Sequence, residues 1–477
     1  MRRAKIRTLY IAAIASAFSS SGIINQCNAA QLNQARRKPN IVFIMADDLG
    51  WSDVGYNGAE FYETPNIDAL CKSGMEFTSA YPGGANCMPS RACIMSGMYT
   101  PRTKMWTPGR VAKGDPRFMR FLVPNQKNRR GDGKIPTKGS LGPSVVSLAH
   151  VLKQAGYKTL HLGKWHLGRE NPLGFDRNDV NGRGAGLEKD QKFYGNKDVA
   201  EWLTDAAVEY IAENKEGTQP FFIYLNHYDV HVPINARDAV VEKYRKKKAT
   251  QKWNRNWNPV YAAMVEAVDR SVGRVWQSLK ANGLEENTLL IFTSDNGGYG
   301  GATWNTPLKG SKGSFYEGGI RTPLCISWPG KIKPRTTCHT PVTGVDYMPT
   351  FAELAGAVPP TTQPVDGVSI VPLLRGQPLA ERSVYWHYPL YLDGRVKTKP
   401  VFSTDRMHWR TTPCSVIRHG DWKLIQFFET DTTELYNLKQ DPGEQSDLAT
   451  DHRDKVKELL SLLKAWQTNT ERTFRKP

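Results

Sequence analysis

The sequence predicts an α/β fold, with a large, mostly parallel sheet flanked by helices and a smaller C-terminal antiparallel sheet plus helix. Four short apolar runs are continuous rather than alternating, as strands buried on both faces are. Between these runs lie patterns with apolar residues every three or four positions, which are typical of amphipathic helices. Near residue 375 the chain changes to short strand-like segments separated by turn residues.

The first part of the chain carries the elements of the predicted parallel sheet. The apolar runs occupy residues 41–45, 159–162, 220–225 and 288–293, and the helical patterns occupy residues 144–155, 198–212 and 261–280. Because 477 residues exceed the usual size of one compact core, we expect two packed units. We assign residues 38–376 to the larger, N-terminal domain.

Residues 377–477 are predicted to form the smaller subdomain. Short strands are expected at residues 383–387, 415–418 and 422–428, and His419-Gly420-Asp421 supplies a hairpin turn between the last two. An amphipathic helix is expected at residues 452–466.

Residues 1–30 have the pattern of a cleaved signal peptide. Four basic residues precede an apolar stretch over residues 9–24, and small residues end the segment. An uncleaved anchor is the alternative, but the stretch is interrupted by serines and falls short of the roughly 20 apolar residues that span a bilayer. No other segment could form a stable membrane span, so we expect a secreted or periplasmic protein.

The strongly basic composition favours a polyanionic partner. The formal charge is +18, and about +14 remains after the signal peptide is removed. Zinc-finger spacings, aromatic RNA-binding motifs and basic heptads are missing from the sequence, so we expect no nucleic acid. A sulfated or carboxylated glycan fits better. Residues 101–140 hold eleven Lys or Arg against two Asp, either as a solvated loop or as a basic lip over a site.

Seven cysteines give no complete disulfide framework. Cys325 and Cys338 could form one bridge. Buried free thiols are the alternative for the others.

Polar side chains follow each of the four predicted strands. In open α/β sheets, ligands bind at the carboxyl ends of the strands. One such pair could be a solvated turn or a helix cap. Because all four predicted strands are followed by such residues, we expect a functional site at one edge of the sheet. In chain order they are Asp47 and Asp48, Lys164 and His166, His227 and His231, and Asp295 and Asn296.

The most specific motif is Cys87-Met88-Pro89-Ser90-Arg91, followed by Ser96-Gly97 and Arg102. A cysteine near a helix start, with Pro89 at a favourable first-turn position, is the structural alternative. The motif closely resembles the signature of the formylglycine-dependent type I sulfatases of the alkaline phosphatase-like superfamily, in which this cysteine is oxidised to an aldehyde.

The resemblance extends across nearly the whole chain after residue 38. It implies that residues 38–376 are the catalytic sulfatase domain, that Cys87 is modified, and that a formylglycine-generating maturation enzyme is a partner. The other matching landmarks are Pro39-Asn40-Ile41-Val42, Ala46-Asp47-Asp48-Leu49-Gly50, Thr64-Pro65-Asn66-Ile67-Asp68, Gly163-Lys164-Trp165-His166-Leu167-Gly168, Ser294-Asp295-Asn296-Gly297-Gly298, Gly310-Ser311-Lys312-Gly313, Glu317-Gly318-Gly319-Ile320-Arg321, Trp422-Lys423-Leu424 and Glu434-Leu435-Tyr436-Asn437-Leu438.

The resemblance also implies a metal site. Asp47, Asp48, Asp295 and Asn296 would bind one divalent cation beside the modified Cys87. Their hard oxygen donors suit Ca²⁺, or less often Mg²⁺, rather than zinc.

The implied chemistry is hydrolysis of a sulfate ester. Hydration of the aldehyde gives two geminal hydroxyls; one attacks sulfur, with Asp295 as the base, and the second expels sulfate when the aldehyde re-forms. The remaining roles are as follows: Arg91 holds the hydrated aldehyde, Lys164 and Lys312 bind sulfate oxygens, His166 contacts the diol, and His231 is the general acid.

Several other residues have structural interpretations that we favour. The role of His227 stays open, because Asp229-Val230 stands where the family often has a proline. His161 is interpreted as a core histidine and Lys309 as a surface charge, and a cleft position is disfavoured for His387, His408 and His419.

Two other functions compete with sulfate ester hydrolysis. The first is a phosphodiester or phosphonate monoester hydrolase of the same superfamily. The second is a glycan-binding protein without catalysis, which is disfavoured because none of the expected site positions is missing.

Overall fold

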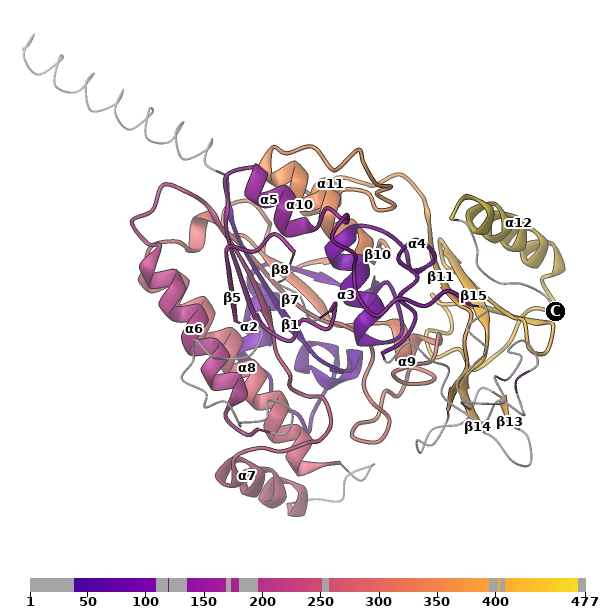
Figure 1. The fold of residues 1–477 in the computed structure, drawn as a ribbon. Helices are drawn as coiled ribbons and strands as arrows, with labels where there is room; N and C mark the ends of the chain where they lie inside the picture. The colour runs from indigo at the N-terminus through magenta and orange to yellow at the C-terminus, as the bar shows by residue number, and fades with distance from the viewer. Residues whose placement is uncertain are drawn as a thin grey trace, which may run out of the picture. The chain divides into compact units, whose positions relative to one another are not determined.

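The core of the structure is a sheet that, among the described residues, has eight strands in the order β5-β4-β6-β1-β7-β8-β2-β9 (Figure 1). The computed structural model describes residues 38–108, 119, 135–168, 173–179, 196–250, 257–393, 402–403 and 408–470, so the predicted signal peptide lies outside it. The strands are β1 (Asn40–Ala46), β2 (Met75–Phe77), β4 (Lys158–Gly163), β5 (Arg177–Asp179), β6 (Phe221–Asn226), β7 (Thr288–Ser294), β8 (Leu324–Ser327) and β9 (Thr336–Cys338).

The four predicted apolar runs are the central strands β4, β6, β1 and β7, each within about one residue at either end. They are parallel neighbours. Strand β8 runs antiparallel to both β7 and β2, so the sheet is mostly, but not wholly, parallel. The predicted fold class is confirmed.

Each central strand is continuous in apolar residues because helices cover both faces of the sheet (Figure 1). In β1, Val42 and Ile44 point into one core and Phe43 and Met45 into the other. The first core is closed by α2 (Pro65–Ser73), α6 (Val199–Glu213) and α8 (Pro259–Ala281). The second is closed by α3 (Cys87–Ser96), α5 (Leu148–Gln154) and α10 (Tyr347–Ala355).

The predicted helices over residues 198–212 and 261–280 correspond closely to α6 and α8. Helix α5 begins four residues later than predicted, because Ser147 caps it: the backbone N–H of His150 donates to Ser147 Oγ at 3.3 Å. The short elements that complete the main body are β3 (Ala80–Tyr81), α4 (Thr100–Thr103), α7 (Asp238–Ala249), α9 (Glu317–Ile320), β10 (Val342–Thr343) and α11 (Val371–Leu374).

A second, antiparallel sheet follows in the order β11-β15-β16-β17. Its strands are β11 (Ser383–Tyr388), β15 (Cys414–His419), β16 (Trp422–Phe427) and β17 (Thr432–Asn437), and helix α12 (Arg453–Asn469) follows β17. As predicted, β15 and β16 form a hairpin; Gly420 in its turn has φ +56°. Strand β17 was not among the predicted strands.

The two faces of this second sheet have different neighbours. Val384 and Trp386 pack with Tyr81 and Phe315 of the main body, whereas the opposite face packs on α12 through Leu424 and its neighbours. Trp386 also donates a hydrogen bond from Nε1 to Pro82 O at 2.8 Å. The second sheet is thereby fixed directly beside the segment that leads into α3.

A small third sheet, in the order β12-β14-β13, extends from the second one. It comprises β12 (Leu392–Asp393), β13 (Phe402–Ser403) and β14 (His408–Thr411). None of these strands was predicted.

The proposed bridge between Cys325 and Cys338 is wrong. Cys325 pairs with Glu76 of β2, and Cys338 pairs with Phe77 on the other edge of the same strand. Two interstrand spacings, roughly 9–10 Å, therefore separate them, which is beyond the reach of a disulfide. All six cysteines of the described residues are buried free thiols.

The described part of the chain has no helix that combines the length and the apolar character needed to cross a membrane.

Candidate active site

The carboxyl ends of the four central strands meet at one edge of the main sheet, and the predicted polar residues follow them there. Asp47 and Asp48 come directly after β1, and Asp295 and Asn296 directly after β7. Lys164 follows β4 immediately. Asp48 and His166 have positive φ values of 67° and 61°, so tight local turns direct the chain as it leaves two of these strands. The predicted convergence at this edge is confirmed.

Cys87 is the first residue of α3, and the extended backbone of Asn86 precedes it. The helix begins two residues before Pro89, so Pro89 lies in its first turn, as predicted. Arg91 lies one turn further along α3. Its guanidinium is fully buried; Nε donates to Asp295 Oδ2 at 2.9 Å and Nη1 donates to Lys164 O at 2.8 Å, while Nη2 lies 2.8 Å from Asp295 Oδ2 as part of the ion pair.

Two lysines complete the charge balance of the site. Lys164 Nζ pairs with Asp47 Oδ2. Lys312, which lies on the loop between β7 and α9, places its Nζ 2.6 Å from Asp48 Oδ1 and 2.7 Å from Oδ2. Both ammonium groups are buried beside carboxylates, and these neighbours raise the pKa of each lysine against the opposing effect of burial.

Three acids lie close together in this site, and their pKa values differ. Burial, together with the nearby Asp295 and Asp48, raises the pKa of Asp47 well above its usual value, although Lys164 opposes the shift. Burial also acts on Asp48, but Lys312 and His231 outweigh it and lower the pKa of Asp48 to about 2. Arg91 likewise lowers the pKa of Asp295 against the effect of burial.

The oxygens of this cluster fit a hard divalent cation. Single ligand atoms of Asp47, Asp295 and Cys87 lie within 4.8 Å of one another, as do those of Asp47, Asp48 and His231. Asp47 Oδ1 and Asn296 Oδ1 are buried without a hydrogen-bond partner among the described residues. The Nδ2 of Asn296 donates to Asp48 Oδ1 at 2.9 Å, which leaves its carbonyl oxygen available. Unpaired buried oxygens and crowded carboxylates are what a cation would satisfy.

The pKa values of His166 and His231 are both lowered in the site. Burial, with Lys164 and Arg91 nearby, lowers the pKa of His166 to about 3. Burial lowers the pKa of His231 to about 4, although Asp48, whose Oδ2 lies 3.6 Å from Nε2, acts in the opposite direction. His227 is fully buried, and both of its ring nitrogens lack a partner among the described residues.

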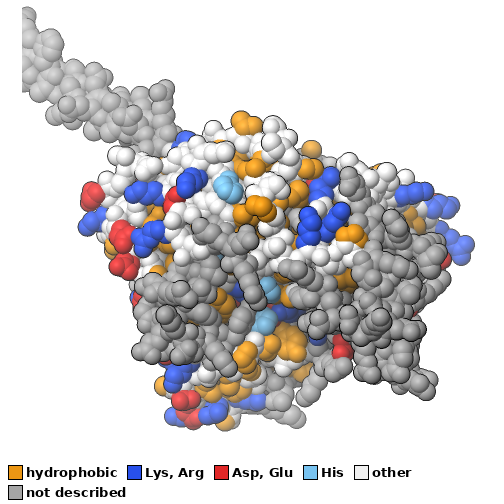
Figure 2. Space-filling view, viewed as in Figure 1, with side chains coloured by type: hydrophobic (Ala, Val, Ile, Leu, Met, Phe, Trp, Pro, Cys, Tyr) orange, Lys and Arg blue, Asp and Glu red, His pale blue; other side chains and the backbone are white. Residues whose placement is uncertain are grey.

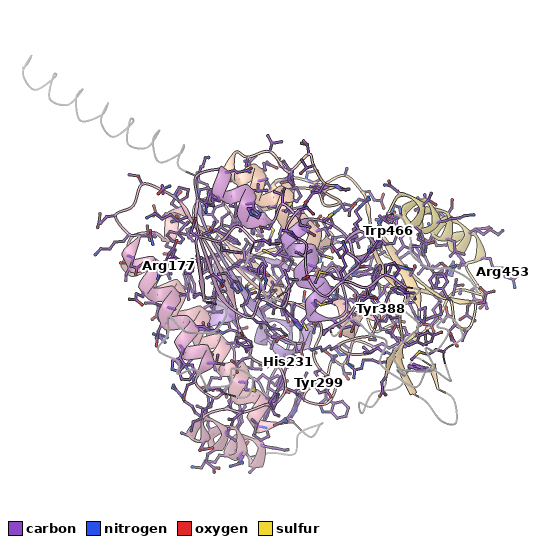
Figure 3. The ribbon with its side chains drawn as sticks, in the orientation of Figure 1. Arg177, His231, Tyr299, Tyr388, Arg453 and Trp466 are labelled. Carbon is purple, nitrogen blue, oxygen red and sulfur yellow. The ribbon has the colours of Figure 1, made fainter. Side chains whose placement is uncertain are left out.

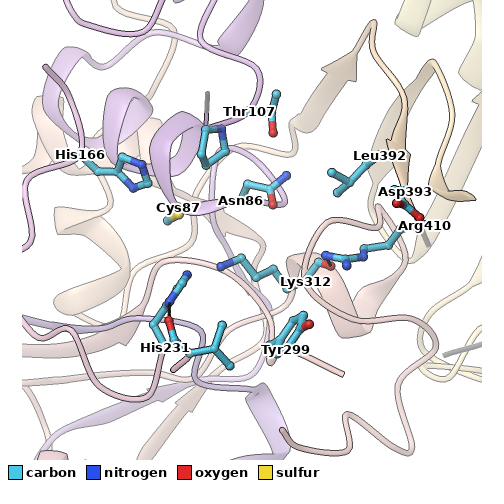
Figure 4. Close-up of a pocket in the computed structure, with 12 residues that line it drawn as sticks. Asn86, Cys87, Thr107, His166, His231, Tyr299, Lys312, Leu392, Asp393 and Arg410 are labelled. Atoms are coloured by element: carbon cyan, nitrogen blue, oxygen red, sulfur yellow. Dashed lines mark hydrogen bonds between the residues drawn. The ribbon is translucent and has the colours of Figure 1, made fainter. Parts of the chain in front are cut away.

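A cavity of about 420 Å³ opens from this edge (Figure 4). Histidine side chains reach the surface near the centre of the face in Figure 2, and Figure 3 places His231 beside Tyr299 at this position. The cavity is lined by Asn86, Cys87, Thr107, Pro108, His166, His231, Val232, Tyr299, Lys312, Leu392, Asp393 and Arg410.

Of the predicted residues, Cys87, His166, His231 and Lys312 line the cavity directly. The sequence analysis missed Tyr299 and the side chains from β12 and β14. Tyr299 could have been found from its position just after Asn296 on the same loop. Leu392, Asp393 and Arg410 lie on strands of two and four residues, which give no periodic signal.

Among the described side chains, none of the residues with structural interpretations lines the cavity. As predicted, His161 is a core residue, fully buried with its ring 5.1 Å from Trp165. As predicted, Lys309 is a surface charge: its side chain is 37% exposed, and its Nζ lies 3.8 Å from Glu434 Oε2 and donates to Tyr436 Oη at 2.9 Å.

Two more histidines bond to serines of the second sheet. His387 Nδ1 lies 2.7 Å from Ser415 Oγ, and His419 Nδ1 lies 3.0 Å from Ser383 Oγ. The side chain of His408, and residues 109–118 and 120–134 of the basic segment, lie outside the described residues.

Comparison with known proteins places this geometry in a family. Residues 39–357 match the family profile described as Sulfatase, and residues 311–470 match the one described as N-sulphoglucosamine sulphohydrolase, C-terminal. A protein named Sulfatase from Formosa agariphila is 33% identical, covering 91% of this chain and 89% of its own. Human Arylsulfatase A is 29% identical, covering 90% and 87%.

Solved structures share the fold. Ps i-CgsB, solved in complex with k-i-k-neocarrahexaose, superposes with a TM-score of 0.71 at 27% identity, covering 92% of this chain and 94% of that one. The phosphonate monoester hydrolase of Agrobacterium radiobacter superposes with a TM-score of 0.63 at 20% identity, covering 91% and 96%, which shows a common fold. With its catalytic-domain profile, its relatives and its fold in agreement, this chain belongs to the sulfatase family of sulfuric ester hydrolases.

Proposed function

We propose that this enzyme hydrolyses sulfate esters on a saccharide, using a formylglycine made from Cys87 and a calcium ion held by Asp47, Asp48, Asp295 and Asn296. The observation that carries the proposal is the position of Cys87. It lies at the start of α3, beside the acidic cluster and at the inner end of a cavity that Lys312 also lines.

The formylglycine and the cation would supply the nucleophile and its activation: the hydrated aldehyde would offer a hydroxyl group, and the cation, held by Asp47, Asp48, Asp295 and Asn296, would lower the pKa of that hydroxyl. The chain's own residues supply the rest. Lys164 and Lys312 keep their charge at neutral pH, since their pKa values are raised, and they bind the sulfate oxygens. Arg91 fixes Asp295 in position through an ion pair and one hydrogen bond from Nε to Oδ2, so that Asp295 can accept the proton of the nucleophile.

His231 is the proposed general acid for the leaving alcohol, and His166 contacts the nucleophile. His231 is partly exposed to the cavity, where a leaving group would lie, whereas His166 faces it from the β4 side. The cations Lys312 and Lys164 contribute to the low pKa of His231. A sulfate anion bound between them offsets their charge, raises the pKa of His231, and so makes its protonated form available when substrate is present.

The substrate class rests on three observations. The cavity is larger than a sulfate group needs, and hydrogen-bonding side chains line its outer part. The chain carries a large positive charge, which attracts sulfated polymers. Ps i-CgsB, which shares the fold at 27% identity, was solved with an oligosaccharide bound. Together with the N-terminal segment, these support export and action on a sulfated polysaccharide or oligosaccharide.

Two measurements test the proposal. Mass spectrometry of the tryptic peptide containing Cys87 should show the mass of the aldehyde or its hydrate in place of the thiol. The same preparation should release sulfate from a sulfated saccharide with a higher kcat/KM than it shows on an aryl phosphodiester. An unmodified cysteine in a fully active preparation would refute the nucleophile, and a preference for the phosphodiester would refute the reaction.

A further inference from the structure

The outer wall of the cavity is built by the C-terminal part of the chain and has no role in the chemistry above. Strands β12 and β14 pair with an irregularity at Leu392 and Asp393, whose partners are Thr411 and Trp409. Arg410 lies between those two partners. This register brings Asp393 and Arg410 to the same wall, opposite Tyr299 of the main body (Figure 4).

Arg410 is held in place yet keeps donors available. Its Nη1 donates to Lys312 O at 3.2 Å, and the guanidinium lies 5.7 Å from the centre of the Tyr299 ring. Its Nε is buried and has no hydrogen-bond partner in the part of the chain that the structure describes. A buried donor without a partner is costly, so a ligand that accepts a hydrogen bond there is favoured.

The contact between Arg410 and Lys312 also depends on a glycine. Gly313 has φ +89°, and a Cβ there would lie 2.4 Å from Leu392 Cδ2 and 2.7 Å from Arg410 Cδ. The sulfate-binding loop and the wall are therefore in direct contact. A group bound by Arg410 would therefore lie near a sulfate bound by Lys312.

We propose that Arg410 and Asp393 are specificity-determining residues that hydrogen-bond ring hydroxyls of the sugar that carries the scissile sulfate, with Tyr299 against one face of that sugar. This inference rests on the proposed function and deepens it.

The chemistry of the pair favours hydroxyl groups over a second anion. A guanidinium only donates and an ionised carboxylate only accepts, whereas a sugar hydroxyl does both. A donor and an acceptor on one wall therefore match a pair of hydroxyls. A second sulfate would gain from Arg410 but would be repelled by Asp393. The ring of Tyr299, which is partly exposed, offers an apolar surface for the C–H face of a pyranose.

The test uses the full-length, matured enzyme and four proteins: wild type, Arg410→Gln, Asp393→Asn and the control Arg453→Gln. Arg453 is exposed at the start of α12, far from the cavity in Figure 3. The substrates are a panel of monosulfated monosaccharides, the deoxy analogues of the best one, and 4-nitrophenyl sulfate, which has no ring hydroxyls.

We expect Arg410→Gln and Asp393→Asn each to lower kcat/KM on the saccharide by about 10- to 100-fold, with a loss at least tenfold greater than on the aryl sulfate. On the analogue lacking the contacted hydroxyl, wild type and variant should differ by less than about threefold. Arg453→Gln should match wild type on both substrates. Activity on the aryl sulfate reports whether each variant has folded and matured.

Equal losses on both substrates, or no loss on the saccharide, would overturn the assignment. A gain by Asp393→Asn on a disulfated saccharide, combined with a loss by Arg410→Gln, would overturn it in favour of a second anionic group. If the wild-type enzyme released sulfate from the aryl sulfate but from none of the saccharides, this result would refute both the proposed saccharide substrate and this inference.

Discussion

Cys87 faces the cavity and belongs to none of the apolar cores, although almost none of its surface is exposed. Its side chain therefore contributes to chemistry more than to packing. We expect Cys87→Ala to abolish sulfate release and to change Tm by less than about 2 °C. Sulfate release assays and calorimetry on the same preparation measure the two effects. Substantial sulfate release by this variant would refute the proposal that Cys87 supplies the nucleophile.

Arg91, in contrast to Cys87, is expected to contribute to stability. It is wholly buried, and in the described structure it bonds only to other parts of the site. Arg91→Ala leaves Asp295 as a buried carboxylate without its partner. We expect a loss of about 3–5 kcal/mol in the free energy of unfolding, measured by urea denaturation. The exposed Arg375 provides the control, since Arg375→Ala should change stability by less than about 0.5 kcal/mol. An Arg91→Ala variant as stable as its control would refute the ion pair.

Sequence reasoning found some site residues and missed others for a physical reason. Lys164 and Asp295 follow continuous apolar strands, whose carboxyl ends are the expected place for ligands. Arg410 and Asp393 follow no such strand. Their positions depend on an irregular pairing between two strands of two and four residues, and only the folded chain reveals that register.

Among the elements, α9 and β16 are joined by a buried cluster of charges. Lys423 Nζ lies 2.9 Å from Glu317 Oε1 and 2.8 Å from Glu444 Oε1, and the backbone N–H of Glu317 donates to Glu444 Oε2 at 2.7 Å. Arg321 lies 3.6 Å from Glu317, and Arg418 bonds to Tyr81 beside it. The cluster connects the second sheet to the segment that follows Lys312.

Glu444 makes this cluster sensitive to pH. Burial, with Glu317 nearby, raises the pKa of Glu444 to about 7 against the effect of Lys423. The unfolded chain loses this proton near its ordinary pKa of 4.5, so between about pH 4.5 and 7 the folded state holds one proton more. The contribution of Glu444 to the free energy of unfolding therefore falls as pH rises through that window, by at most about 1.4 kcal/mol per pH unit.

Glu444→Gln removes this titration. We expect the free energy of unfolding of the variant, relative to wild type, to rise between pH 5 and pH 8, as measured by urea denaturation at each pH. Glu458→Gln, an exposed substitution on α12, should show no such trend. A constant difference between Glu444→Gln and wild type over this range would mean that Glu444 is ionised throughout.

Two different causes explain why some elements, or their extent, could not be predicted from the sequence. Strands such as β2 and β9 have three residues each, too few to show a period. For helix α3 only the start near Cys87 was expected, from the position of Pro89; all ten of its residues are buried, so it has no polar face and no amphipathic pattern that would show its extent. The long amphipathic helices α6 and α8, and the apolar central strands, were predictable because one face or both faces bury apolar side chains.

At the scale of the molecule, the acidic cluster joins the ends of β1 and β7. We expect a chelator to lower both sulfate release and Tm, because Asp47 Oδ1 and Asn296 Oδ1, which are buried without a hydrogen-bond partner among the described residues, would lose the cation that satisfies them. Calcium should restore both. At a concentration 100 times Kd, its contribution to stability is about 2.7 kcal/mol.

Two variants separate a specific site from general ion effects. Asp47→Asn should lose the calcium dependence of Tm, whereas Asp451→Asn, on an exposed turn, should retain it. If prolonged chelation leaves activity and Tm unchanged, the metal assignment is wrong.

The complete burial of α3 bears on whether Cys87 can be modified before or after the chain folds. If a maturation enzyme oxidises Cys87 as proposed, it would have to reach Cys87 and its neighbours, yet in the folded chain Ser90 bonds to Gly84 O and Arg91 is paired with Asp295. We therefore expect the proposed oxidation to happen while the chain is still unfolded, and we expect a molecule that folds first to stay inactive. Incubating folded, unmodified protein with a formylglycine-generating enzyme should leave the Cys87 thiol intact by mass spectrometry, while a peptide spanning residues 80–100 is converted. Equal conversion of both would show that α3 opens readily. If only the peptide is converted, folding competes with modification, and the rate of folding limits the yield of active enzyme.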